Sequence, residues 1–284
     1  MALRVASLTT RPITSCPGSA FQLTNVNFEV PKAGKIALVG PNGSGKSTLL
    51  RALLGTIDLL EGSVAFDDGP LNAEVEYSAI RFDFAYVGQD PDASFVTSTV
   101  EDEVAFALCN TAMQPDDIRA RVTQALDACG IEHLRYRNLS TLSGGQKQRV
   151  CIAAALALKP RVLLLDEPFS MLDASARTCV RRALANFDPK TSLIQISHRF
   201  DEISDFDSVI ALDAGRIVWQ GSPCEFMAQP GLSEKTGLRA TPYATHEALS
   251  YDARFTYAGW TSLSRENSTS GRDAAASLLQ AQQC

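Results

Sequence analysis

The chain has 284 residues, of which 45% are hydrophobic and 20% are charged. These fractions are typical of a globular protein and exclude a chain that is mainly disordered or collagen-like. Lys and Arg total 26 against 32 Asp and Glu, a net charge of -6, so no global basic field favours a nucleic-acid partner. The longest nearly apolar run, residues 150–158, is about half of the ~18 to 20 residues that a membrane-spanning helix needs. Seven cysteines without C-x-x-C spacing and no apolar secretory core in residues 1–11 favour a reducing cytoplasm and no disulfides.

Short apolar runs rich in β-branched residues alternate with helical patterns, which predicts the α/β class with a mainly parallel sheet. Three central strands are predicted at residues 35–39, 162–165 and 193–196. The first is followed by a helix over 47–54 that ends at Gly55. Residues 210–212 and 217–219 flank a turn that contains Gly215, and they predict a hairpin near the sheet edge.

Residues between 89 and 143 have helical character with polar links. Thr99 and Asp102 fit a capping box that opens a helix through residue 106. A second helix, ending at Gly130, is indicated by apolar residues that recur every four positions: Ile118, Val122 and Leu126. After residue 220 the composition shifts to Ser, Thr and Ala with scattered aromatic residues. This shift predicts a small packed appendage and then a loose tail with one weak helix over 273–282.

A glycine-rich loop follows the first predicted strand and opens the first predicted helix. It reads Gly40, Pro41, Asn42, Gly43, Ser44, Gly45, Lys46 and Ser47, with Thr48 next. Glycines let successive backbone N–H groups point inward, and the helix N-terminus adds partial positive charge, so phosphate fits there. Lys46 would reach the β and γ phosphates and Ser47 would hold Mg²⁺. The alternative is a glycine-rich loop that only reverses the chain direction, but the strand before it and the helix after it favour nucleotide binding.

An apolar strand ends in two acids, Asp166 and Glu167, at the sheet edge where parallel sheets bind ligands. Asp166 is placed to hold the Mg²⁺ shell, and Glu167 to polarise the attacking water as a base. The alternative is that one acid only caps the following turn. A phosphate loop in the same chain favours the catalytic interpretation.

Ser143, Gly144, Gly145 and Gln146 stand directly before a helical run that ends at Lys159 and Pro160. Ser143 as a simple N-cap is the default interpretation when the motif is taken alone. Six elements of this sequence occur in the order found in ATP-binding-cassette (ABC) ATPases. They are the phosphate loop, Gln89, this Leu-Ser-Gly-Gly-Gln run, the strand that ends in two acids, the Ser-Met-Leu-Asp run that ends at Asp173, and His198. The chain resembles that family over roughly residues 3–228.

The resemblance implies an ATPase domain over residues 1–228 with a helical subdomain at about 90–150, then an appendage over 229–284. Domains of this family pair head to tail, so Ser143 and Gly145 of one subunit would touch the γ-phosphate held by Lys46 of the other. The resemblance places Gly144 and Gln146 in the same nucleotide-binding signature.

The resemblance also assigns residues outside the phosphate loop and the signature. It implies that Gln89 contacts the metal and the attacking water, that His198 holds the γ-phosphate and orients the base, and that Asp173 lies at the dimer seam. Pro12 stands where such domains commonly have a tyrosine that stacks on adenine, with Phe21 as a substitute or as ordinary packing.

A narrower resemblance is to the ATPase subunits of energy-coupling-factor (ECF) transporters, which import vitamins, cobalt or nickel. It rests on Gln89-Asp90-Pro91-Asp92, Phe95-Val96, residues 99–106 and Met171, with Ser94 where that group often has glutamine. The implied partners are a second ATPase subunit, identical or similar, and an integral-membrane scaffold. The implied location is therefore peripheral, on the cytoplasmic face of the cell membrane.

Several alternatives stay open beside the ECF interpretation. Acidic residues near Gln89 (Asp90, Asp92, Glu101, Asp102 and Glu103) suit basic groups on the scaffold, or form a solvated face. The alternative functions are a conventional ABC importer or exporter ATPase, a non-transport ABC ATPase, and a degenerate cassette that only binds ATP.

Overall fold

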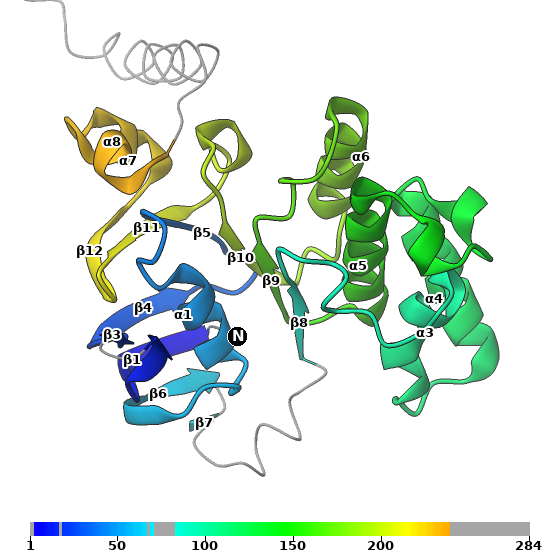
Figure 1. Cartoon of the computed structure of the whole chain (residues 1–284), viewed down its shortest axis with the longest axis horizontal. Coiled ribbons are helices and arrows are strands. Elements are labelled where there is room, and N and C mark those ends of the chain that lie inside the picture. The colour runs from blue at the N-terminus through cyan, green and yellow to red at the C-terminus, as the bar shows by residue number, and fades with distance from the viewer. Residues whose placement is uncertain (1–2, 17–18, 67–68, 71–82, 239–284) are drawn as a thin grey trace, which may run out of the picture. The chain divides into compact units, whose positions relative to one another are not determined.

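The computed structural model describes residues 3–16, 19–66, 69–70 and 83–238. Its contacts divide the chain into two compact units, residues 1–240 and 241–284. The second unit, with the helix expected over 273–282, lies outside the described residues. The described strands form a six-stranded, a four-stranded and a two-stranded sheet, with helices around them (Figure 1).

The central sheet has six strands and confirms the α/β class. Their order is β12 (Arg216–Gly221), β11 (Ser208–Asp213), β5 (Lys35–Val39), β10 (Ser192–Ile196), β9 (Val162–Asp166) and β8 (Phe84–Val87). All neighbours pair in parallel except β12, which pairs antiparallel with β11 at the edge. Every residue of β9 is buried, as a parallel strand covered on both faces requires. The predicted strands and the edge hairpin are confirmed, and β8 is an additional strand.

A second sheet and helix α1 (Lys46–Leu53) enclose one side of the core. The four antiparallel strands are β4 (Val26–Val30), β1 (Leu3–Thr10), β6 (Leu59–Phe66) and β7 (Gly69–Pro70). Leu49 and Leu50 of α1 belong to one buried apolar cluster with Ile36 of β5 and Val5 of β1. This packing holds α1, and the loop before it, against the central sheet. The short strands β2 (Ile13–Cys16) and β3 (Ser19–Phe21) pair with each other.

The helices predicted between residues 89 and 143 are confirmed as α3 (Val100–Cys109) and α4 (Pro115–Ala128), and α5 (Gly144–Leu158) follows them. In Figure 1 these helices lie together on the side of the central sheet away from the four-stranded sheet. The Thr99 hydroxyl accepts a hydrogen bond from the Asp102 N–H at 3.3 Å, which caps α3 as expected. Gly130, with φ +63°, ends the α4 segment. Helix α6 (Ala174–Ala185) follows β9 and contacts α4 and α5.

Two short helices follow the edge hairpin. Helix α7 (Pro223–Ala228) opens with a capping box between Ser222 and Glu225, and hydrogen bonds from Ser222 hold the pKa of Glu225 below its usual value. Helix α8 (Leu232–Thr236) contacts β11. It lies beyond residue 228, the expected domain boundary, and within the compact unit 1–240.

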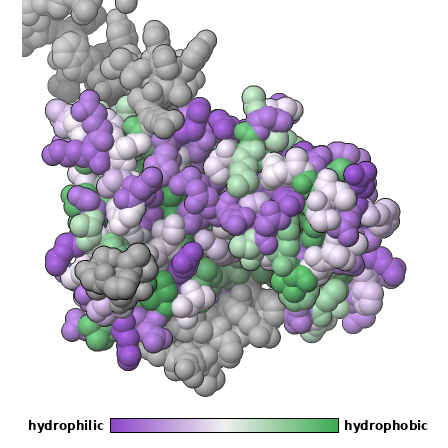
Figure 2. All heavy atoms as spheres, viewed as in Figure 1, coloured by the Kyte–Doolittle hydropathy of each residue, from purple (hydrophilic) through white to green (hydrophobic). Residues whose placement is uncertain are grey.

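The face shown in Figure 2 is mostly hydrophilic, and its hydrophobic side chains form small separate groups. Among the described residues, no helix combines the length and the apolar character that a bilayer crossing needs.

Candidate functional site

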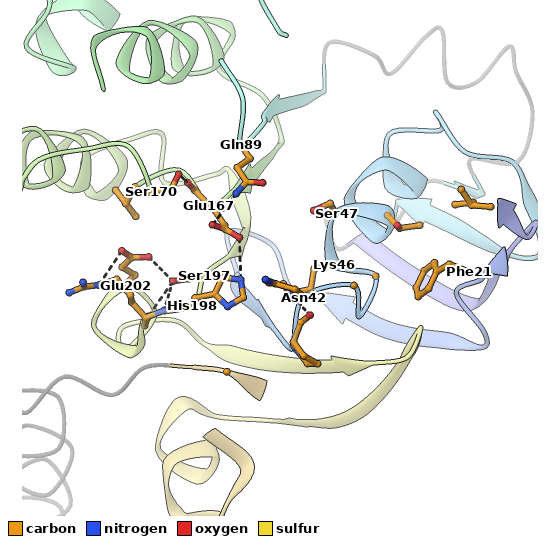
Figure 3. Close-up of a pocket in the computed structure, with 18 of the residues that line it drawn as sticks. Phe21, Asn42, Lys46, Ser47, Gln89, Glu167, Ser170, Ser197, His198 and Glu202 are labelled. Carbon is orange, nitrogen blue, oxygen red and sulfur yellow. Dashed lines mark hydrogen bonds and ion pairs between the residues drawn. The ribbon is translucent and has the colours of Figure 1, made fainter. Parts of the chain in front are cut away.

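A cavity of about 1040 Å³ opens at the carboxyl ends of the central strands (Figure 3), the edge where parallel sheets bind ligands. Its wall comes from segments that are distant in the sequence. The lining residues are Ile13, Phe21, Pro41, Asn42, Gly43, Gly45, Lys46, Ser47, Thr48, Gln89, Glu167, Phe169, Ser170, Arg177, Ser197, His198, Arg199, Glu202 and Gly237. The fold therefore brings the predicted phosphate loop together with Gln89, Glu167 and His198.

The glycine-rich loop joins β5 to α1, and two of its glycines are required by close packing. At Gly40 (φ +150°), a Cβ atom would lie 2.2 Å from the backbone oxygen of Leu212 in β11. At Gly45 (φ +105°), a Cβ atom would lie 2.6 Å from the ring of Phe21. Any side chain at either position would displace its neighbour, so the loop keeps its tight course only with glycine.

Lys46 is the first residue of α1 and is only 7% exposed. Its ammonium donates hydrogen bonds to the backbone oxygens of Gly40 at 2.8 Å and Pro41 at 3.0 Å. Burial lowers the pKa of Lys46, and the charges of Glu167 and Asp166 oppose that shift. A partly desolvated ammonium at a helix N-terminus is a point charge that an anion would stabilise strongly.

Glu167 follows β9 directly and contacts two predicted site residues, one through an ion-pair contact with His198 and one through a hydrogen bond that it accepts from Gln89. The His198 Nε2 lies 3.1 Å from Oε1, and the Gln89 Nε2 lies 3.4 Å from Oε2. Figure 3 shows these three side chains converging from separate strand ends. Glu167 has a left-handed backbone with φ +50°, and the Ser170 N–H and hydroxyl both donate to its carbonyl oxygen, at 3.1 and 3.0 Å. A strained backbone of this kind is concentrated at functional sites.

Asp166 is the last residue of β9 and is 5% exposed. One of its carboxylate oxygens accepts a hydrogen bond from the Tyr86 hydroxyl at 3.3 Å. Burial raises the pKa of Tyr86, and the negative charge of Asp166 adds to the shift. The carboxylate therefore lies beside the cavity without forming its lining.

The family model described as ABC transporter matches residues 23–170. The chain belongs to the ABC transporter family. Curated relatives support this assignment. The chain is 38% identical over 212 residues to the energy-coupling factor transporter ATP-binding protein EcfA1 of Latilactobacillus sakei subsp. sakei (strain 23K), covering 74% of this chain and 75% of that protein. It is 39% identical over 205 residues to EcfA1 of Streptococcus agalactiae serotype Ia, covering 72% of this chain and 73% of that protein.

Solved structures agree with the ABC assignment. The structure of cbiO1 from Clostridium perfringens, described as part of the ABC transporter complex cbiONQ, matches with a TM-score of 0.68 and 30% identity, over 88% of this chain and 98% of that one. A dimeric ATP-binding cassette, MJ0796, in a post-hydrolysis state with ADP and Pi, matches with a TM-score of 0.69 and 26% identity, over 78% of this chain and 98% of that one. The α/β fold is thus that of an ABC ATPase.

The second predicted anion motif of this ABC ATPase lies outside the cavity lining. The Ser143 hydroxyl accepts a hydrogen bond from the Gln146 N–H at 3.4 Å, and the Gln146 side chain accepts one from the Ser143 N–H at 2.9 Å. This capping box opens α5, with Ser143 and Gly144 exposed. Asp173 caps α6 through a single hydrogen bond, which its side chain accepts from the Ala176 N–H at 2.8 Å. The cap interpretation of Ser143 is therefore confirmed, and any further role requires a ligand from outside this cavity.

Several cavity residues were missed by sequence reasoning. The buried carboxylate of Glu202 accepts a hydrogen bond from the Ser197 hydroxyl and lies 3.6 Å from the Arg199 guanidinium. Burial raises the pKa of Glu202. Arg177 of α6 donates to the Phe169 carbonyl at 3.3 Å. The only sequence signal that could have placed Ser197 and Arg199 in the cavity is that they flank His198. No sequence signal marks Arg177.

The wall nearest the glycine-rich loop contains Phe21 and Ile13. Pro12, where the resemblance expects an adenine-stacking tyrosine, does not line the cavity. In Figure 3 Phe21 lies at the end of the cavity opposite Glu202, beside the loop. The aromatic ring available there is therefore Phe21, and stacking on adenine stays a prediction.

Part of the acidic region beside Gln89 is paired within the chain. Asp92 forms an ion pair with Lys147, and Glu101 forms one with Arg135 at 3.0 Å. Glu103 is buried and accepts hydrogen bonds from the N–H groups of residues 96 and 97. The acidic charge available to basic groups of another protein is therefore smaller than the sequence indicated.

Proposed function

We propose that this chain is the ATP-hydrolysing subunit of an ECF-type membrane transporter, which energises uptake of a vitamin or of a cobalt or nickel ion. The curated relatives named EcfA1 and the cbiO1 structure support the transporter class. The observation that carries the hydrolytic function is the single cavity that combines a phosphate loop with Glu167, His198 and Gln89. Alternatives are the ATPase of a conventional ABC importer or exporter, and a non-transport ABC ATPase.

The glycine-rich loop is proposed to bind the ATP phosphates. Its backbone N–H groups and the start of α1 form an anion-binding concavity, and Lys46 adds a desolvated positive charge. When ATP enters, the Lys46 ammonium would exchange its bonds to the Gly40 and Pro41 carbonyls for charge-assisted bonds to phosphate. The same loop thus holds the lysine in place before the substrate arrives.

Ser47, Gln89 and Asp166 are proposed to hold Mg²⁺. The residues fit this ion because all three offer oxygen atoms, which Mg²⁺ prefers, and because Ser47 and Gln89 line the cavity. Asp166 is nearly buried beside them and accepts only the Tyr86 hydroxyl among the described side chains. When bound, the ion would neutralise charge on the β and γ phosphate oxygens.

Glu167 is proposed as the general base. Its carboxylate pairs with His198, accepts a hydrogen bond from Gln89 and reaches the cavity from the strand end. A water held by Glu167 would lose its proton to the carboxylate as it attacks the γ-phosphorus, and ADP would leave with the bridging oxygen. His198 and Gln89 orient the carboxylate, so catalysis consists mainly of positioning and charge stabilisation.

A second ATPase subunit is proposed to complete the site. Ser143, Gly145 and Asp173 do not line this chain's cavity, whereas exposed Ser143 lies at the start of α5, which offers N–H groups to an anion. The MJ0796 cassette is dimeric. Two head-to-tail subunits, alike or merely similar, would place the signature of each, with Gly144 and Gln146, on the ATP of the other. ATP then closes the dimer and hydrolysis reopens it.

An integral-membrane scaffold is proposed as the further partner, with this chain bound peripherally at the cytoplasmic face of the cell membrane. The test is purification of the tagged full chain from detergent-solubilised membranes, with mass identification of subunits and measurement of ATP-dependent phosphate release. Copurification of one membrane scaffold with a vitamin- or metal-binding membrane subunit supports the ECF assignment. ATPase activity with no membrane subunit supports a non-transport ABC ATPase instead.

A further inference from the structure

Two side chains of α5, directly after the signature motif, contact the segment that carries Gln89. Gln148 is completely buried, and its Nε2 donates a hydrogen bond to the Gly88 carbonyl oxygen at 3.3 Å. The neighbouring Lys147 forms an ion pair with Asp92. The two contacts attach to the segment 88–92 on either side of Gln89, and therefore hold both of its ends.

The two contacts differ in burial. The Lys147 side chain is only 15% exposed, whereas that of Asp92 is 64% exposed, so solvent screens this ion pair in part. The Oε1 atom of Gln148 is buried and has no hydrogen-bond partner in the described part of the chain. Retaining an amide at a buried position where one end stays unpaired is costly. The hydrogen bond from the Gln148 Nε2 to the Gly88 carbonyl is therefore the interaction that an amide at this position gains.

The position of Gln89 depends on this attachment. Gly88 follows β8, whose pairing with β9 places Val87 opposite Leu165, two residues before Glu167. Beyond Gly88 the exposed Gln89 bonds to Glu167 at 3.4 Å, near the limit of a hydrogen bond. A shift of a few tenths of an ångström in segment 88–92 would break that bond. Within the described residues, Lys147 and Gln148 are the α5 side chains that restrain the segment.

We propose that Lys147 and Gln148 are positioning residues for hydrolysis, which fix Gln89 relative to Glu167 and tie it to the signature helix. The proposal rests on the function proposed above. Because Ser143 begins the same helix, a displacement of α5 by the facing subunit's ATP would pass through these two contacts to this chain's own Gln89. The occupancy of one ATP site would in this way change the geometry of the other.

The test is a charge swap in the full chain, assayed for phosphate release with the membrane subunits that copurify. Asp92→Lys and Lys147→Asp alone should each lower kcat by roughly 2- to 150-fold, the fold-change that corresponds to the usual coupling energy of contacting residues, with the KM for ATP unchanged. The double variant, Asp92→Lys with Lys147→Asp, should recover most of the parental kcat. A matched swap at Asp116 and Arg119, an exposed pair on α4, should leave kcat at the parental value.

Gln148→Met supplies the second arm, because methionine keeps the volume and removes the donor. A variant with a parental thermal midpoint should show lower kcat and unchanged KM for ATP. If it unfolds, the charge swap alone decides. Parental kcat in both single charge variants, or failure of the double variant to recover it, overturns the proposal. Loss of membrane subunits with Asp92→Lys that Lys147→Asp does not restore also overturns it, since Asp92 would then act in docking. A parental protein without ATP hydrolysis refutes the proposed function instead.

Discussion

Replacing Glu167 by glutamine should remove the proposed base while keeping its place in the site. The amide oxygen of the substituted side chain would still face the His198 Nε2, which lies 3.1 Å from the carboxylate, whereas its amide nitrogen would face the Gln89 Nε2 and lose the hydrogen bond that the carboxylate accepts. A general base contributes about 10²- to 10⁴-fold to rate, or roughly 3 to 5 kcal/mol on the barrier. ATP binding should change little, because the glycine-rich loop and Lys46 are untouched.

The assay is phosphate release by the assembled complex at saturating ATP, with ATP affinity and closed-dimer content measured on the same preparation. The variant should bind ATP, accumulate the closed dimer and release phosphate about 10²- to 10⁴-fold more slowly. Glu225→Gln is the matched control, since glutamine also serves in the capping box at the start of α7. Hydrolysis by Glu167→Gln at the parental rate would refute the assignment of the base.

Three further predictions concern other parts of the cavity. Lys46→Met should weaken ATP binding by roughly 10- to 150-fold in an equilibrium titration, from the loss of a charged hydrogen bond worth about 1.5 to 3 kcal/mol. Phe21→Ala should weaken ATP binding by about 1 to 3 kcal/mol if its ring stacks on adenine, while Phe21→Tyr should not. Burial raises the pKa of Glu202. The stability that the protonated acid contributes is therefore fully present below the pKa that Glu202 has in the unfolded chain, and it is lost as the pH rises through the higher pKa in the folded protein. Glu202→Gln should therefore raise the thermal midpoint relative to the parent by more at pH 7.5 than at pH 4, by about 2 to 4 °C.

The parts of the site that follow strands could be predicted from the sequence because local patterns determine them. The glycine-rich loop between a buried strand and a helix, and the acids at the end of β9, are contiguous and depend on near neighbours. Parallel pairing of β5, β10 and β9 then brings Lys46, Glu167 and His198 to one edge. The positions of the strands were therefore enough to predict that these residues lie close together.

Contacts between segments that are distant along the chain could not be predicted in this way. Arg177 lines the cavity only because α6 packs beside the strand ends. Nothing around it in the sequence distinguishes a residue of the cavity wall from one on the solvated surface. The pair of Asp92 with Lys147 joins residues that are 55 positions apart. The charge pattern along the sequence indicated that Asp92 lies on an open acidic face. That pattern contains no information on Lys147, which is distant in the sequence and close in the fold.

Ser143 shows how one residue can satisfy both interpretations left open by the sequence. Its capping box with Gln146 stabilises α5, and removing such a cap costs about 0.5 to 2 kcal/mol, so loss of activity in Ser143→Ala alone would not establish a contact across a dimer. A mixed dimer separates the two roles. One copy carries Lys46→Met and the other carries Ser143→Asn, which keeps a capping side chain. Contact across the dimer leaves one composite site with both parental residues, so the mixed dimer should hydrolyse ATP faster than either variant alone, at up to about half of the parental rate. Contact within one chain leaves a defect in each site, and the mixed dimer would then be as inactive as its parents.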